Sequence, residues 1–242
     1  MLKRLLLFFA CWSVGKAGAQ DTAFAHQTTQ AAIHQAVTSY HLYTDKQSRL
    51  FRGIEYFGHS PMIQGIPFFQ ENTWQRGYIV YDDIAYDTVR MMFDLVKDKV
   101  VILHYNGFYR LSLFSEKIKE FSFLNHHFLR LEHDSLRNSA PVTGFYDMLY
   151  TGNTSVVVRR TKFIEETVRE QVERKFIVKD FFYIRTQDGV FHIIRTKGAL
   201  RSVLKDRSRE VKQYMRKNKL RFRQDKEKAI VQAVTYYDSL KK

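Results

Sequence analysis

Clustered cationic side chains are the residues of this sequence best suited to binding chemistry. The stretch 216–223, Arg-Lys-Asn-Lys-Leu-Arg-Phe-Arg, is the densest basic run of the chain. Cations at this density attract phosphate-bearing polyanions, because binding releases the counterions that the phosphates hold. The candidate polyanion-binding residues are Arg209, Lys212, Arg216, Lys217, Lys219, Arg221 and Arg223. The competing interpretation, and the commoner meaning of a basic run, is a solvated helix face that keeps the protein soluble.

The net charge of the chain is concentrated in the same region. The 242 residues include 39 Lys and Arg and 25 Asp and Glu, and residues 20–194 hold 20 of each sign. Residues 195–242 hold 16 basic residues against 5 acidic ones. This asymmetry suggests a negatively charged partner, either an anionic membrane surface or an acidic protein. Nucleic acid is not expected as a partner, because no recognition motif accompanies the charge.

Catalytic chemistry has weaker support. Asp82, Asp83 and Asp87 form a small acidic cluster, but a turn explains Asp82-Asp83 and the wet face of a strand explains Asp87. The sequence contains no Gly-x-Ser-x-Gly, no glycine-rich phosphate loop and no His-Glu-x-x-His. No catalytic residue is therefore assigned, and a hydrolase without a recognisable motif stays open as an alternative.

Three histidines, His126, His127 and His133, are the best candidates for a metal site. Strand alternation places His127 and His133 on one side, but about 20 Å apart at about 3.3 Å per residue. They cannot share an ion without ligands from elsewhere in the chain. Ordinary surface or hairpin histidines are the expected interpretation, and neither a metal nor a cofactor is assigned.

The first residues, 1–19, have the composition of a cleaved export signal. Lys3-Arg4 precede an apolar run from Leu5 to Val14, and Ala17-Gly18-Ala19 supplies the small residues of a cleavage site. The apolar run is shorter than the roughly 20 residues that span a bilayer. Acylation at Cys11, the only cysteine, is the alternative processing. We expect an exported, periplasmic or envelope-associated protein whose mature chain has no cysteine and no transmembrane segment.

Residues 49–194 are expected to form an antiparallel β-rich domain. From Trp74 to Leu131 the pattern is one of short strands separated by polar turns, with Asn106-Gly107 the strongest indication of a hairpin. Further hairpins are predicted about 151–153 and at Asp188-Gly189. The stretch 86–94 is typical of a strand in a sheet that has one face exposed to solvent. Its alternation predicts one face with Val89, Met91 and Phe93 and the other with Thr88, Arg90 and Asp94.

Helices are expected at both ends of the chain. Residues 20–48 form a weakly helical segment, and the stretch 165–175 is either a solvated helix or a long excursion between strands. From Lys197 the apolar period becomes helical, with an interruption at Asn218 and a second helix after it. The predicted fold is mainly β (α+β): an antiparallel β-meander body with a weak N-terminal helix and two C-terminal helices. The basic segment, residues 195–242, packs on this body or projects from it.

Several short motifs accompany this organisation. They are Trp74 to Gly77 at the start of the β-rich body, and Lys197 to Asp206, Lys217 to Phe222 and Tyr236 to Leu240 in the terminal segment. In these motifs and in the signal at its start, the chain resembles a group of uncharacterised exported proteins of Gram-negative bacteria. The resemblance covers most of the mature chain. It implies a periplasmic or envelope location, and no activity or site comes with it.

The sequence therefore favours a non-catalytic envelope protein that binds an anionic surface or partner through its basic C-terminal helices. One alternative is a carrier or sensor of an apolar ligand, held among aromatic side chains in a curved β-sheet. Aromatic residues are more often core than pocket, which counts against this alternative.

Overall fold

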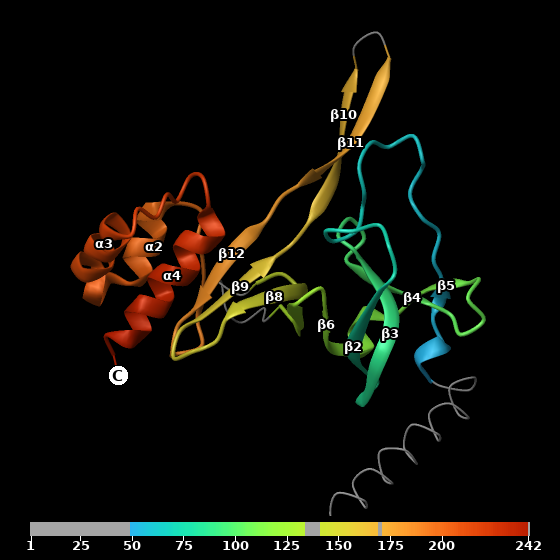
Figure 1. Ribbon diagram of the computed structural model, residues 1–242, viewed down its shortest axis with the longest axis horizontal. Coiled ribbons are helices and arrows are strands. Elements are labelled where there is room, and N and C mark those ends of the chain that lie inside the picture. Colours follow the sequence, from blue (N-terminus) through green and yellow to red (C-terminus); the bar gives the residue numbers. More distant parts are fainter. Residues whose placement is uncertain (1–48, 134–140, 169–170, 242) are drawn as a thin grey trace, which may run out of the picture. The chain divides into compact units, whose positions relative to one another are not determined.

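The computed structural model describes residues 49–133, 141–168 and 171–241 (Figure 1). The predicted export signal, residues 1–19, and the predicted helical segment, residues 20–48, lie outside the described residues and stay predictions. Residues 49–242 form one compact unit. Its described part is mainly β, with α-helices towards the C-terminus, which confirms the predicted fold class.

Eleven of the described strands form one antiparallel sheet. In spatial order they are β1 (Ile54–Glu55), β5 (Arg110–Ser112), β4 (Lys99–Leu103), β3 (Ile84–Asp94), β2 (Gln75–Tyr81), β6 (Ile118–Phe123), β7 (His126–Leu131), β8 (Gly144–Tyr150), β9 (Ser155–Arg159), β12 (Phe181–Arg185) and β13 (Phe191–Ile193). Most neighbours in the sheet are also neighbours along the chain, as a meander of hairpins requires. The turns at Asp82-Asp83 and Leu124-Asn125 have both residues at positive φ, the geometry that matches the twist of paired strands.

A two-stranded hairpin leaves this sheet between β9 and β12. It consists of β10 (Lys162–Val168) and β11 (Val172–Val178), which pair antiparallel. Glu166 faces Arg174 across the hairpin, with 2.7 Å between Arg174 Nε and Glu166 Oε2. The solvated-helix alternative for 165–175 is therefore wrong. Glu166 and Arg174 are partners on opposite strands, a relation that periodicity along one segment does not reveal.

Three described α-helices follow the sheet: α2 (Lys197–Val203), α3 (Ser208–Lys217) and α4 (Lys226–Ser239). The first expected helix is divided, because the 3-10 turn η4 (Lys205–Arg207) separates α2 from α3. Two further 3-10 turns, η2 (Arg49–Phe51) and η3 (Ser115–Lys117), lie earlier in the chain. Side-chain caps begin two of the helices: Thr196 Oγ1 accepts from the Ala199 amide, and Asp225 Oδ1 accepts from the Lys228 amide.

Aromatic side chains fill the core beneath strands β2 to β8. Phe93 lies 5.2 Å from Phe121, 5.3 Å from Phe128 and 5.7 Å from Phe145 between ring centroids, in edge-to-face orientations. Phe121 stacks on Phe128 at 4.8 Å. Such pairs add to the free energy of burial. These rings contact one another, which favours their assignment to the core over the lining of a ligand cavity.

A second core joins the helices to strands β9 and β12. Val156, Val158, Phe182 and Ile184 pack there with buried residues of all three helices. The alternate residues Val157 and Tyr183 pack on the opposite face with Tyr146. The alternation of β9 follows its sequence pattern, and one of its faces holds the basic segment against the sheet.

The face of β3 with Thr88, Arg90 and Asp94 was predicted to be exposed to solvent. This prediction is wrong at the C-terminal end of the strand. Thr88 and Arg90 are exposed, but Met92 is buried and Asp94 is 0 % exposed. Tyr56 and Phe68, from the segment before the meander, pack with Met92 and cover this end of the face. Alternation cannot reveal such a cover, because it comes from residues distant in the sequence.

Gly77 on β2 is a position where the sheet leaves no room for a side chain. A Cβ there would lie 2.4 Å from the Ser122 carbonyl oxygen and 2.9 Å from Phe123 Cβ. We expect Gly77→Ala to lower the free energy of unfolding by about 1–3 kcal/mol, because backbone must shift to admit the methyl group. Urea denaturation measures it. Gly198→Ala is the matched control: its nearest neighbour would be Thr196 Oγ1 at 3.6 Å. An equal loss in both variants would contradict the steric explanation.

Candidate functional site

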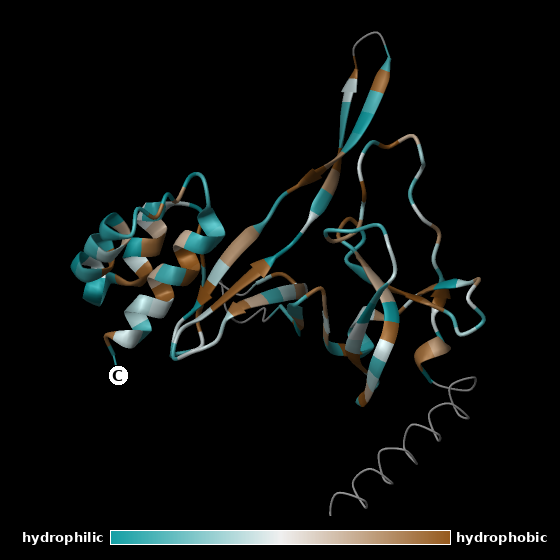
Figure 2. Ribbon diagram, viewed as in Figure 1, coloured by the Kyte–Doolittle hydropathy of each residue, from teal (hydrophilic) through white to brown (hydrophobic). Residues whose placement is uncertain are grey.

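The seven predicted basic residues lie on α3 and on the loop that joins it to α4. Arg209, Lys212, Arg216 and Lys217 belong to α3, while Lys219, Arg221 and Arg223 belong to the loop. All seven are exposed. We call these seven residues the basic surface. In Figure 2 the ribbon of α3 is mostly coloured hydrophilic.

Apolar anchors explain why these cations face outward. Val211 and Met215, four residues apart on α3, are buried in the second core. In the loop, Leu220 and Phe222 are partly buried against the same core, so the intervening basic residues point away from it. Lys226 Nζ lies 5.8 Å from the centroid of the Phe222 ring, and burial lowers the pKa of Lys226, with Asp180 opposing the shift. The buried apolar residues of α3 and the loop therefore leave the basic side chains facing solvent.

The acidic residues of the terminal segment all have partners outside the basic surface. Glu210 pairs with Arg207, Asp206 with Lys241, and Glu227 with Arg160, while Asp225 caps α4 and Asp238 accepts from Tyr150 and Thr154. No residue of the basic surface forms an ion pair with a described residue; Arg221 donates a hydrogen bond to the Gln224 side chain at 3.2 Å. The positive charge of the basic surface is therefore uncompensated within the described part of the chain.

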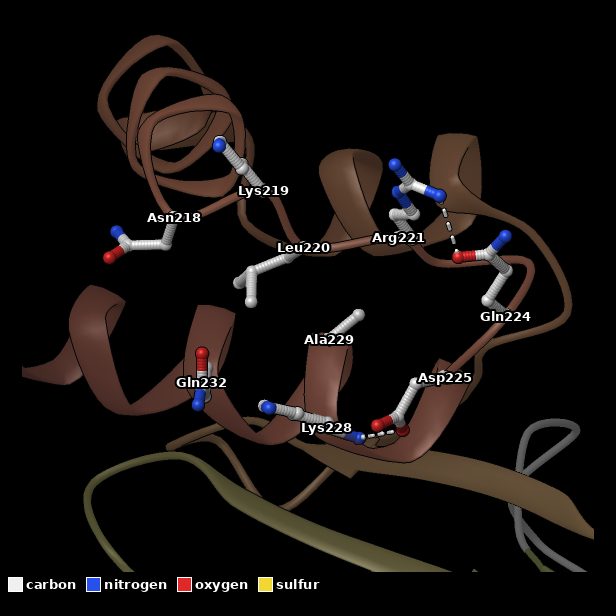
Figure 3. Close-up of a pocket in the computed structure, with 9 residues that line it drawn as sticks. All are labelled: Asn218, Lys219, Leu220, Arg221, Gln224, Asp225, Lys228, Ala229 and Gln232. Atoms are coloured by element: carbon white, nitrogen blue, oxygen red, sulfur yellow. Dashed lines mark hydrogen bonds between the residues drawn. The ribbon is translucent and has the colours of Figure 1, made fainter.

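A pocket of about 380 Å³ lies between the α3–α4 loop and α4 (Figure 3). Its lining residues are Asn218, Lys219, Leu220, Arg221, Gln224, Asp225, Lys228, Ala229 and Gln232. Three cations and three side-chain amides supply hydrogen-bond donors, the groups that bind phosphate oxygens. The one carboxylate, Asp225, already accepts from the backbone amide of Lys228. The pocket can thus hold an anionic group by charge and by direct hydrogen bonds.

The structure brings together only part of the predicted set in this pocket. Lys219 and Arg221 line it, and the other five basic-surface residues do not. Lys228 was missed by the sequence analysis, although it follows the capping Asp225 by one helical turn. The spacing from Asp225 to Lys228 was the one feature of the sequence that could have placed Lys228 in the candidate site.

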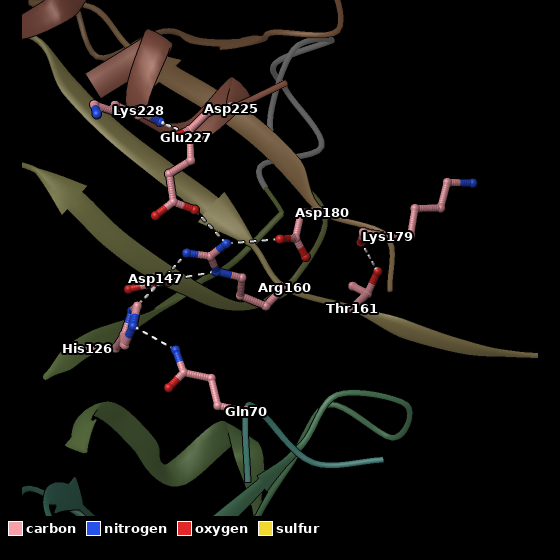
Figure 4. Close-up of polar contacts among 10 residues, drawn as sticks. All are labelled: Gln70, His126, Asp147, Arg160, Thr161, Lys179, Asp180, Asp225, Glu227 and Lys228. Atoms are coloured by element: carbon pink, nitrogen blue, oxygen red, sulfur yellow. Dashed lines mark hydrogen bonds and ion pairs between the residues drawn. The ribbon is translucent and has the colours of Figure 1, made fainter. Parts of the chain in front are cut away.

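A buried ionic network, centred on Arg160, ties the start of α4 to the sheet (Figure 4). Arg160 follows β9 directly and its side chain is 10 % exposed. Its Nη2 lies 2.8 Å from Asp147 Oδ2, and its Nη1 lies 2.9 Å from Asp180 Oδ2 and 2.7 Å from Glu227 Oε2. Burial acts to lower the pKa of Arg160, but these carboxylates outweigh it and raise that pKa. The network fixes α4, and hence one wall of the pocket.

The candidate metal histidines have separate surroundings. His126 Nδ1 lies 2.8 Å from Asp147 Oδ2, and its Nε2 lies 3.1 Å from Gln70 Nε2. His127 lies beside Glu120, while the His133 amide donates to Thr143 Oγ1. The described residues contain no group of three His, Cys, Asp or Glu side chains that could hold a metal ion.

In the candidate acidic cluster, the two turn residues Asp82 and Asp83 have different ion-pair partners. Asp82 pairs with Arg49 and Lys117, and Asp83 pairs with Lys119. Both are turn residues at positive φ, as the turn assignment from the sequence requires. The arrangement places these carboxylates in surface ion pairs, which stabilise folded proteins little.

Asp94 is a polar centre that the sequence analysis missed. Its Oδ2 accepts from Tyr56 Oη at 2.8 Å and lies 2.8 Å from His59 Nε2, while its Oδ1 accepts from two backbone amides. Burial, with the bond to Asp94, raises the pKa of the Tyr56 hydroxyl above its ordinary range. Asp94 therefore holds the covering segment through Tyr56 and His59, and the turn after β3 through the amides of Val96 and Lys97, which is a structural role.

No helix among the described residues is both long and apolar enough to cross a membrane. No family model, no curated protein and no solved structure matches the chain. The chemistry of the basic surface and its pocket is therefore the indication of function that the described residues give.

Proposed function

We propose that this chain is an exported, non-catalytic protein of the cell envelope that attaches to an anionic surface through its basic surface. The observation that carries the proposal is the exposure of seven cations that have no ion-pair partner among the described residues. Solvated helix faces usually interleave both charge signs, which stabilise one another at short spacing. Here the acids of the same segment are engaged elsewhere, so the positive field is left to an external partner.

The size of the expected attraction supports a membrane as that surface. A Lys or Arg close to an anionic leaflet contributes about 1 kcal/mol. If the whole basic surface reached the headgroups together, the attraction would be about 7 kcal/mol, which corresponds to a dissociation constant of roughly 10 μM and is enough for reversible attachment. The predicted leader, residues 1–19, favours envelope phospholipids or other phosphate-bearing lipids over nucleic acid.

Within the basic surface, the α3–α4 pocket is the part suited to an individual phosphate group. Lys219, Arg221 and Lys228 surround it, and the amides of Asn218 and Gln232 add neutral donors. We assign the pocket to a headgroup phosphate and the rest of the basic surface to non-specific attraction.

The test is sedimentation of the chain from Gln20 onward with vesicles of phosphatidylglycerol and phosphatidylcholine, compared with vesicles of phosphatidylcholine alone. We expect binding to the anionic vesicles alone, and release as salt rises from about 0.1 M to about 1 M, which shortens the Debye length from about 10 Å to about 3 Å. Binding that ignores both lipid charge and salt would overturn the proposal.

A further inference from the structure

An exposed aromatic turn lies between β4 and β5, away from the helices in the sequence. Phe108 is 85 % exposed, Tyr109 56 % and Tyr105 47 %. Phe51 packs at its base, with ring centroids 5.2 Å from His104 and 5.5 Å from Tyr105. We call Phe51, His104, Tyr105, Phe108 and Tyr109 the aromatic tip. Scattered single apolar residues on a surface need no explanation, but several exposed aromatic residues on one turn are typical of an interaction site.

Hydrogen bonds hold the turn in one conformation. Asn106 Oδ1 accepts from the Phe108 amide at 3.0 Å, and the His104 amide donates to the Tyr109 carbonyl at 2.9 Å. Gly107 has φ +77°, a value that glycine adopts without strain. The exposed Phe108 is therefore presented by a structured turn, so little conformational entropy is lost when it contacts a partner.

Charge around the aromatic tip favours a negatively charged partner. Arg52 and Arg110, next to Phe51 and Tyr109 in the chain, are exposed and form no ion pair with a described residue. Tyr and Phe with adjacent Arg are the side chains that settle at the headgroup level of a bilayer, with rings in the interface and guanidinium groups on phosphates. A convex turn of a few residues also presents far less area than the roughly 800 Å² per partner of a stable protein interface.

We propose that the aromatic tip inserts Phe108 and its neighbouring tyrosines into the interface of an anionic lipid bilayer. This deepens the proposed function, and rests on it for the anionic membrane, but it uses residues outside the basic surface. Insertion of the tip adds an apolar contribution that salt does not screen, whereas the attraction of the basic surface weakens with salt.

The experiment places tryptophan at the tip and measures its quenching by bromine on the lipid acyl chains. Phe108→Trp is made in the chain from Gln20 onward, where Trp74 is the one natural tryptophan. Met62→Trp is the matched control, because Met62 is also 85 % exposed but lies outside the aromatic tip. With vesicles of brominated phosphatidylglycerol and phosphatidylcholine, we expect a blue shift and quenching for Phe108→Trp and neither for Met62→Trp.

A second variant, Phe108→Ser, measures the contribution of the ring to binding. We expect about tenfold weaker binding to anionic vesicles with an unchanged salt dependence, since an apolar contact is lost and no charge. If Phe108→Trp stays unquenched while the protein is bound, the proposal is overturned and the basic surface alone accounts for attachment. Quenching that persists when binding proves insensitive to salt would support the aromatic tip and count against the proposed role of the basic surface.

Discussion

A chain carrying Lys217→Glu, Lys219→Glu, Arg221→Glu and Arg223→Glu is expected to bind anionic vesicles at least about a thousandfold more weakly than the unmodified chain. Each cation near the surface contributes about 1 kcal/mol, so removing four removes about 4 kcal/mol, and the new carboxylates add repulsion. All four side chains are exposed and none is in an ion pair with a described residue. The fold should therefore be unaffected, which a urea denaturation curve will show.

The control for this variant changes net charge equally at other sites. Arg76, Arg90, Lys119 and Lys175 are exposed cations on β2, β3, β6 and β11. Their replacement by Glu should leave most of the vesicle affinity intact, because screening limits the attraction to charges within about 10 Å of the lipid at 0.1 M salt. If both variants lost affinity alike, binding would follow total charge, and the assignment to the basic surface would fail.

Arg160→Met is expected to lower the free energy of unfolding by about 3–5 kcal/mol. Asp147 is 1 % exposed and would keep His126 as its side-chain partner, while Asp180 is partly buried. Removing their shared guanidinium therefore leaves two carboxylates with little access to water and fewer partners. The change is a large part of the 5–15 kcal/mol typical of a folded domain. The midpoint of urea denaturation measures it, provided the slope of the transition is unchanged.

Two further variants compare the stability that the buried network contributes with that of an exposed ion pair. Arg174→Met removes the partner of Glu166 on the exposed hairpin, where both side chains are about half exposed, and should cost less than about 1 kcal/mol. Adding Asp147→Asn to Arg160→Met should recover part of the loss, since the buried charge is then removed as well. A loss for Arg160→Met no larger than that for Arg174→Met would show that the network contributes little.

Much of the β body follows from local rules in the sequence. Turn residues such as Asn106-Gly107 and Asp188-Gly189 favour hairpins whatever surrounds them, because their backbones accept the conformations that hairpin turns require. The alternation of β9 likewise predicts which of its valines share a face, since side chains alternate along any strand. The exposure of the basic surface was also predictable, because Val211 and Met215 fix the inner side of α3 and leave the cations outside.

What the tertiary structure alone decided involves partners that are distant along the chain. Asp94 lies within the predicted alternation of β3, yet Tyr56 and Phe68 cover it. Arg160 shows no special feature in the sequence. It becomes the centre of a network because β8, the residue just before β12, and α4 each bring a carboxylate to it.

The surface features also fall into those set by the sequence and those set by the tertiary structure. The sequence by itself determined where strands turn, which helix residues are apolar and where the positive charge accumulates, because these depend on near neighbours. Burial, ion pairing and the pocket beside Lys228 depend on which distant segments pack together, and a linear pattern does not contain that information.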